Sequence, residues 1–163
     1  MEGGLKQMAE IIQTKIQDVW IKPLLKLPDE RGMIMHMLRA DEHIFEKFGE
    51  IYFSIGLPGV IKGWHHHTRQ SQNYAVIQGM IKLVLYDDRE SSTSKGVLIE
   101  IFTGEDKYEL IHIPPGITNG YKTYGTKPAI VANCADLPHD PHEIIRYNPL
   151  NSHIDYNWDI MHC

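Results

Sequence analysis

The sequence predicts an all-β protein, a barrel or sandwich of antiparallel strands preceded by one amphipathic helix. Between residues 29 and 146, short runs rich in Ile, Val, Tyr and Phe alternate with Gly, Pro, Asp and Ser, a texture typical of short strands joined by turns. Gln78-Gly79 separates two of the strongest runs and indicates a tight hairpin. Ahead of these runs, apolar residues recur at spacings of three and four, which indicates a helix.

The expected helix runs from Leu5 to Trp20, with polar residues on its other face and with its apolar stripe formed by Leu5, Met8, Ile11, Ile12, Ile16 and Val19. Pro23 and Pro28 follow it. We therefore expect residues 1–28 to form a helix and connector packed on the barrel or on a neighbouring subunit, and residues 29–163 to form the main domain.

Nine runs within the main domain are candidate strands. They are Met33–Arg39, Glu50–Ile55, Gly59–Lys62, Asn73–Ile77, Met80–Tyr86, Val97–Phe102, Leu110–Ile113, Gly120–Thr123 and Ala129–Cys134.

Length and charge exclude several classes of function. The 163 residues suffice for one domain, and a net charge of -5 without a Lys/Arg cluster argues against nucleic-acid binding. No window approaches the ~20 apolar residues of a membrane span, and no signal-peptide pattern opens the chain, so we expect a cytoplasmic protein. Cys134 and Cys163 are expected to be free thiols.

The run His65-His66-His67 is the first candidate for chemistry. Because side chains alternate along a strand, His65 and His67 share one face and His66 points to the other. Two imidazoles on an inward face suit metal ligation or proton transfer. A structural cluster of hydrogen-bonded histidines is the alternative.

Two segments resemble the motifs of the cupin superfamily. His65-x-His67, Gln72 and Gly79 follow the first motif, and the run Pro114-Pro-Gly-Ile-Thr-Asn119 resembles the second. The resemblance implies a jelly-roll barrel. Gln72 and Asn119 stand where these proteins place metal-binding Glu and His, and neutral amides are poorer ligands. We therefore expect no metal and no cofactor; a metal held by His65, His67, Gln72 and Asn119 is the alternative.

A closer resemblance, from Asp29 to about Asp159, is to the dTDP-4-dehydrorhamnose 3,5-epimerases and related nucleotide-sugar cupins. The similar segments are Asp29–Gly32, Gly59–His65, Tyr86–Arg89, Ile113–Tyr121 and Tyr147–Trp158. This resemblance implies a homodimer that binds a nucleoside-diphosphate 4-keto sugar inside the barrel, where a base removes the proton beside the ketone and an acid returns one on the other face.

The resemblance also implies roles for individual residues. His65 falls on the catalytic base, and Arg31 on an arginine that contacts the nucleotide. Lys62 replaces an arginine and keeps a cation for the diphosphate. Gln72, Asn119 and Tyr121 are the other expected substrate-binding residues.

Two expected catalytic groups are replaced. Gln72 stands where the family has the lysine that stabilises the enolate, and Ala132 where it has the tyrosine that acts as acid. His67 and Tyr74 are candidates to fill the gap, since Tyr74 shares strand parity with Gln72; a core tyrosine with a bonded hydroxyl is the alternative. Cys134 shares parity with Ala132 and is expected to line the pocket.

Three functional readings follow. The first is an enzyme that epimerises or isomerises a dTDP-type 4-keto-6-deoxy sugar by enolisation in deoxysugar or polysaccharide biosynthesis. The second is a non-catalytic barrel that binds the sugar or nucleotide sugar. The third is a metal-dependent enzyme that uses His65 and His67.

Overall fold

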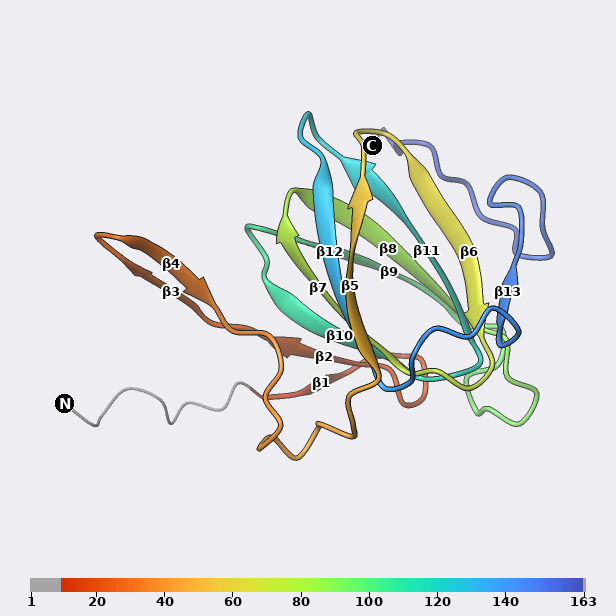
Figure 1. Cartoon of the computed structure of the whole chain (residues 1–163). Helices are drawn as coiled ribbons and strands as arrows, with labels where there is room; N and C mark the ends of the chain where they lie inside the picture. The colour runs from red at the N-terminus through yellow and green to blue at the C-terminus, as the bar shows by residue number, and fades with distance from the viewer. Residues whose placement is uncertain (1–9, 163) are drawn as a thin grey trace.

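The computed structural model describes residues 10–162 and contains strands only (Figure 1). The strands are β1 (Ile12–Gln13), β2 (Trp20–Pro23), β3 (Lys26–Asp29), β4 (Gly32–Met35), β5 (Glu50–Gly56), β6 (Ile61–His67), β7 (Gln72–Gln78), β8 (Met80–Asp87), β9 (Leu98–Gly104), β10 (Glu109–Ile113), β11 (Ile117–Tyr124), β12 (Ala129–Ala135) and β13 (Ile144–Arg146). No helix able to span a membrane occurs in this part of the chain.

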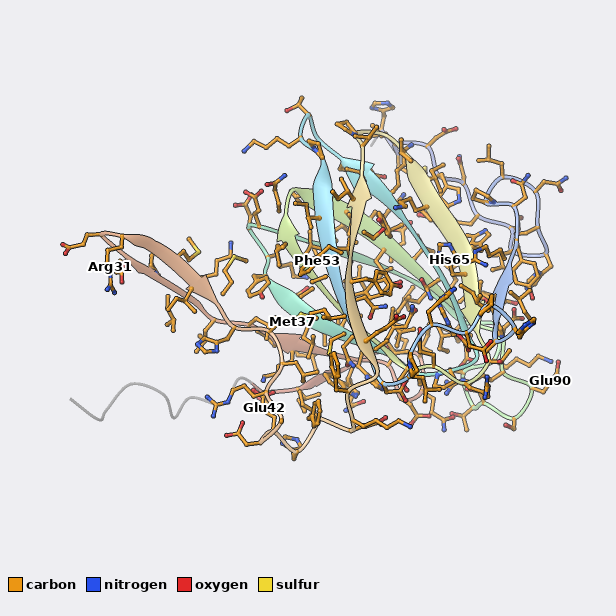
Figure 2. All side chains as sticks on the ribbon, viewed as in Figure 1. Arg31, Met37, Glu42, Phe53, His65 and Glu90 are labelled. Atoms are coloured by element: carbon orange, nitrogen blue, oxygen red, sulfur yellow. The ribbon has the colours of Figure 1, made fainter. Side chains whose placement is uncertain are left out.

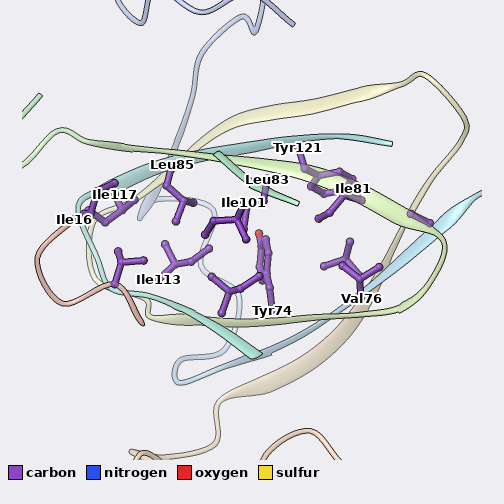
Figure 3. Packing of buried hydrophobic residues seen from close by; sticks show 14 residues of the cluster. Ile16, Tyr74, Val76, Ile81, Leu83, Leu85, Ile101, Ile113, Ile117 and Tyr121 are labelled. Carbon is purple, nitrogen blue, oxygen red and sulfur yellow. The ribbon is translucent and has the colours of Figure 1, made fainter. Parts of the chain in front are cut away.

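Two antiparallel sheets face each other as the walls of a barrel. One has the strand order β1-β2-β10-β7-β12-β5, and the other has the order β13-β6-β11-β8-β9. Fourteen buried side chains pack between them, and Figure 3 shows Tyr74 and Val76 of one sheet facing Leu83 and Tyr121 of the other. The predicted all-β architecture is confirmed.

The predicted helix is wrong for residues 10–20, and residues 5–9 lie outside the described part. Asp18 has a φ of 64°, which an α-helix does not allow. Ile16 and Val19 are buried in the core through a turn, so their helical spacing reflects burial in a loop. β2 pairs with β10, and a boundary at residue 28 therefore does not separate this segment from the barrel.

The hairpin at Gly79 forms as predicted, with a φ of 71° that glycine accommodates. Most expected strands are present with shifted ends. The run expected over Gly59–Lys62 instead continues through the histidines as β6, and Met33–Arg39 contributes only β4. β3 and β4 form a separate hairpin that projects away from the barrel (Figure 1).

The C-terminal segment covers the outer face of the five-stranded sheet. Trp158 packs on Trp64 with ring centroids 4.9 Å apart, and Ile154 and Val84 complete this second apolar cluster. Covering this face anchors β6 from outside, so the opposite side chains of the strand are held toward the barrel interior.

Candidate active site

A cavity of about 430 Å³ opens between the two sheets. Most of its lining comes from β5, β6, β7, β11 and β12, together with residues just before and within β13. The lining residues are Glu50, Tyr52, Ser54, Lys62, His65, His67, Gln70, Gln72, Tyr74, Tyr121, Val131, Asn133, His139, Ile144 and Arg146. Figure 2 labels His65 on β6.

A close approach of β6 to β11 positions the histidines. A Cβ on Gly63 would lie 2.8 Å from the Cα of Gly120, so a larger residue at position 63 would push the strands apart. With glycine at both positions, His65 pairs with Asn119 in the ladder. The two segments that resembled cupin motifs thus meet at one wall of the cavity.

His65 lines the cavity as a neutral imidazole. Burial lowers its pKa to about 4, and the positive charges of Arg146 and Lys62 act in the same direction. An unprotonated ring at neutral pH can accept a proton, which is the property a general base requires.

His67 lies on the same face and is bonded on both ring nitrogens. Its Nδ1 contacts Glu143 Oε1, and its Nε2 lies 3.0 Å from Gln72 Nε2. Glu143 Oε2 also accepts the backbone N–H groups of Thr68 and Arg69, each at 3.1 Å. Burial would raise the pKa of Glu143, but these hydrogen bonds outweigh it and hold the pKa below its usual value.

His66 points away from the cavity, as strand alternation predicts. Its Nδ1 lies 2.9 Å from Thr118 Oγ1, which in turn donates to Asp88 at 3.2 Å. Burial lowers the pKa of His66. The histidine run is therefore divided between two environments, and only His65 and His67 belong to the cavity.

Gln72, Tyr74 and Asn119 are bonded to one another in the cavity wall. Asn119 donates from Nδ2 to Gln72 Oε1 at 3.0 Å, and Tyr74 donates from its hydroxyl to Asn119 Oδ1 at 3.4 Å. Burial raises the pKa of Tyr74 well above its usual value, and the neighbouring Tyr52 and Tyr121 add to this effect. Tyr74 is therefore protonated at neutral pH.

Lys62 and Tyr121 converge on Ser54. Lys62 Nζ donates to Ser54 Oγ at 2.7 Å, and the Tyr121 hydroxyl lies 2.9 Å from the same oxygen. Arg146 lines the same cavity and pairs with His65 across the β13–β6 ladder. The cavity therefore has cationic groups beside the neutral His65.

Arg31 lies outside the cavity of its own chain. It sits in the turn of the β3–β4 hairpin, remote from His65 (Figure 2), with its side chain 84% exposed and bonded to Asp29. The hairpin extends from the barrel, so Arg31 does not contribute to the cavity of its own chain.

The expected orientation of Cys134 toward the cavity is wrong. Val131 and Asn133 line the cavity, so Ala132 and Cys134 point to the outer face of β12. Burial raises the pKa of the Cys134 thiol, which disfavours a nucleophilic thiolate. A shift of one residue in the assumed parity of a strand reverses every side chain on it.

Sequence reasoning missed several cavity residues. The cavity residue Arg146, and Glu143, which bonds to the cavity residue His67 without lining the cavity itself, lie outside the expected strands, and no local spacing connects them to the histidines. Asn133 and Tyr52 were missed because the sequence did not show which side chains of β12 and β5 point into the cavity. Asn133 donates to the Tyr52 hydroxyl at 2.9 Å and accepts the Asn73 N–H through its own oxygen.

Among residues 10–162, no three His, Cys, Asp or Glu side chains gather into a group that could hold a metal ion. The donors around His65 and His67 are mostly amides. His67 would have to lose a bond to Glu143 or Gln72 before it could ligate a metal.

Comparisons with known proteins agree with this geometry. The family model for dTDP-4-dehydrorhamnose 3,5-epimerase matches residues 13–162. The spore coat polysaccharide biosynthesis protein SpsL of Bacillus subtilis (strain 168) is 36% identical over 126 residues, 77% of this chain and 83% of that protein. The probable low-salt glycan biosynthesis epimerase Agl13 of Haloferax volcanii is 31% identical over 151 residues, 89% of this chain and 97% of that protein.

The fold is also similar to that of a solved relative. The dTDP sugar isomerase from Desulfovibrio desulfuricans G20 superposes with a TM-score of 0.88 at 40% sequence identity. The match covers 90% of this chain and 94% of that one.

Proposed function

Because the chain belongs to the dTDP-4-dehydrorhamnose 3,5-epimerase family, we propose that it epimerises a dTDP-type 4-keto-6-deoxy sugar with His65 as the base. The observation that carries this proposal is a neutral imidazole on the wall of a cavity that also holds Lys62 and Arg146. The names of the relatives support a role in polysaccharide or glycan biosynthesis.

The reaction begins with removal of a proton from a carbon beside the ketone. His65 Nε2 or Nδ1 takes this proton, and the electron pair moves to the carbonyl oxygen to form an enolate. Gln72 donates one N–H to His67 and keeps a second amide hydrogen, which we assign to the enolate oxygen. Tyr74, protonated at neutral pH, then returns a proton to the other face of the carbon.

The nucleotide end of the substrate needs cationic partners. Lys62 and Arg146 are the proposed contacts for the diphosphate, and Asn119 and Tyr121 shape the sugar pocket around Gln72. Arg146 forms no ion pair within residues 10–162, so its guanidinium is available for a bidentate contact with a phosphate.

We also propose a homodimer. The outer face of the edge strand β5 carries Ile51, Phe53 and Ile55, which are 50%, 58% and 57% exposed. The projecting hairpin adds the exposed Met33 and Ile34. Uncovered sheet edges and apolar patches of this kind are typically buried by a partner.

In such a dimer, the hairpin provides a way for Arg31 to reach a nucleotide in the partner's cavity, since it cannot reach its own. Phe53→Asp is expected to convert the dimer to a monomer in light-scattering measurements, whereas Leu150→Asp, at a more exposed position outside this face, leaves the dimer intact. A monomeric parent protein would refute this proposal.

A cytoplasmic location stays a prediction, tested by cell fractionation.

The decisive experiment measures deuterium incorporation beside the ketone of a dTDP-4-keto-6-deoxy sugar in deuterium oxide. The parent protein is expected to exchange the proton and His65→Asn to lose exchange by about 10²- to 10⁴-fold. His66→Asn is the matched control, because it changes the neighbouring histidine on the opposite face of β6. Sugar binding by calorimetry without exchange would instead support the non-catalytic barrel, and exchange that requires an added metal would support the metal-dependent alternative.

A further inference from the structure

Five buried polar side chains form one continuous row of contacts, of which His67, Gln72 and Tyr74 line the cavity. Glu143, His67, Gln72, Asn119 and Tyr74 are each at most 6% exposed and come from four separate parts of the chain. The successive contacts are His67 Nδ1 to Glu143, Gln72 Nε2 to His67 Nε2 at 3.0 Å, Asn119 to Gln72 at 3.0 Å, and Tyr74 to Asn119 at 3.4 Å.

When His67 is neutral, the direction of every bond in this row follows from Glu143. Glu143 as a carboxylate can only accept, so His67 carries its proton on Nδ1 and its Nε2 is an acceptor. Gln72 therefore donates to His67 and accepts from Asn119, and Asn119 in turn accepts from the Tyr74 hydroxyl. All the protons point toward Glu143.

A second proton on His67 reverses this direction. Nε2 becomes a donor, and the N–H of Gln72 that faces it is then opposed to another N–H. Half a turn of the Gln72 amide places its oxygen toward His67 and its nitrogen toward Asn119. The Asn119 amide must turn in the same way, because buried donors without acceptors are unfavourable. Its nitrogen then faces the Tyr74 oxygen.

We propose that Gln72 and Asn119 couple His67 to Tyr74, so that the charge of His67 decides whether the Tyr74 proton is held by Asn119 or released toward the cavity. Glu143, Gln72 and Asn119 are positioning residues in this arrangement. No proton passes through the amides; they only rotate. By linkage, a negative Tyr74 oxygen favours a protonated His67 to the same extent.

Gln72 and Asn119, which stand where the cupin motifs have Glu and His, acquire a role in this way. A lysine at position 72 would be a donor only and could not reverse, whereas an amide is donor on one side and acceptor on the other. The use of Tyr74 as the acid rests on the proposed function. In the reversed state its hydroxyl proton is free for the substrate, and Asn119 then donates to the oxygen that lost it.

Other titratable groups face both ends of the row. His65, His66 and Glu143 surround His67, with Lys62 and Arg146 nearby on the cavity wall, and Tyr52 and Tyr121 face Tyr74. Since His65 lines the same cavity and interacts electrostatically with His67, the test uses His65→Asn as the background, which removes that titration.

Nuclear magnetic resonance of the isotope-labelled, ligand-free protein tests the coupling. We expect neutral His67 to carry its proton on Nδ1, and the side-chain resonances of Gln72, Asn119 and Tyr74 to shift with the midpoint of His67. Asn119→Leu should abolish the response of Tyr74 while that of Gln72 remains. The Gln78 amide is an internal control, because it lies on the same strand as Gln72 and Tyr74 but donates to the Pro128 carbonyl outside the row and should not follow this midpoint.

A proton on Nε2 of neutral His67, or a Tyr74 response that survives Asn119→Leu, would overturn the proposal. If His67 stays neutral over the whole range in which the protein is folded, Gln72→Lys and Gln72→Met decide. In Gln72→Lys, whose side chain can only donate, the Tyr74 and Asn119 resonances should shift to the positions of the reversed arrangement. In Gln72→Met, whose side chain is apolar, they should not. Equal spectra of the two variants would overturn the proposal. Because no substrate is present, failure here and failure of the proposed function are distinguishable.

Discussion

Glu143 accepts a hydrogen bond from His67 although 76 residues separate them along the chain. The same carboxylate accepts backbone N–H groups of the loop that follows β6. It thus holds both the loop and the second cavity histidine, and it fixes the tautomer of that histidine. This contact turns a run of histidines into an ordered site.

Glu143→Gln is expected to lower both stability and activity. The substitution keeps the shape but removes the charge, and its new amide N–H groups face the donors that the carboxylate had satisfied. We expect the free energy of unfolding to fall by about 1–3 kcal/mol, measured by urea denaturation. Asp140→Asn is the control, since that carboxylate pairs with the exposed Arg69 at the surface and should change stability little. Equal effects of the two substitutions would contradict a special role for Glu143.

Tyr74→Phe is expected to separate proton removal from inversion. Without the hydroxyl, His65 can still remove the substrate proton, so deuterium should continue to wash out of a labelled substrate. Formation of the inverted sugar should slow by about 10²- to 10⁴-fold. Tyr86→Phe serves as control, because that tyrosine packs on the outer cluster around Trp64 and does not line the cavity. Parallel loss of wash-out and inversion in Tyr74→Phe would argue against an acid on the opposite face.

Arg146→Gln is expected to weaken dTDP binding. The substitution removes a cation from the cavity wall, and a charged hydrogen bond of this kind corresponds to about tenfold to a hundredfold in affinity. The loss should shrink at high salt, since screening weakens partly exposed charges. Calorimetry with dTDP measures it, with the surface Arg69→Gln as control. An unchanged dissociation constant would remove Arg146 from the nucleotide site.

Proton exchange should persist into acid further than for an ordinary histidine base. The pKa of His65 lies at about 4, so the neutral ring is lost only as the pH falls through that value. An unperturbed imidazole would lose activity near pH ~6.5. Initial exchange rates from neutral pH downward provide the test, and a midpoint near that of free histidine would show that the ring is not desolvated in the working enzyme.

The same shift has a consequence for stability. The unfolded chain binds a proton at His65 near pH ~6.5 and the folded chain only near about 4, so acidification between these values favours unfolding. This contribution amounts to at most about 1.4 kcal/mol per pH unit. His65→Asn should make the free energy of unfolding depend less on pH in this range. If the pKa of His65 were ordinary, the parent protein and the variant would show the same dependence.

The sequence by itself was sufficient for the strand-rich architecture, the hairpin at Gly79 and the opposite facing of His65 and His66, because alternation and turn chemistry are local properties. It was misleading for residues 10–20, where Ile16 and Val19 fill the core from a turn and β2 is held by β10. Helical spacing is a weak signal when pairing with a distant strand offers better burial.

The tertiary structure alone decided which side chains line the cavity and which ones bond to the residues that line it. Glu143 and Arg146 reach His67 and His65 through the pairing of β13 with β6, and the facing of β12 placed Asn133 inside and Cys134 outside. It also placed Arg31 outside the cavity of its own chain. Long-range strand pairing and register create these neighbours, and neither is encoded in the local spacing of residues. The sequence therefore indicated the histidines as candidate residues, whereas only the tertiary structure placed their hydrogen-bond and charged partners beside them.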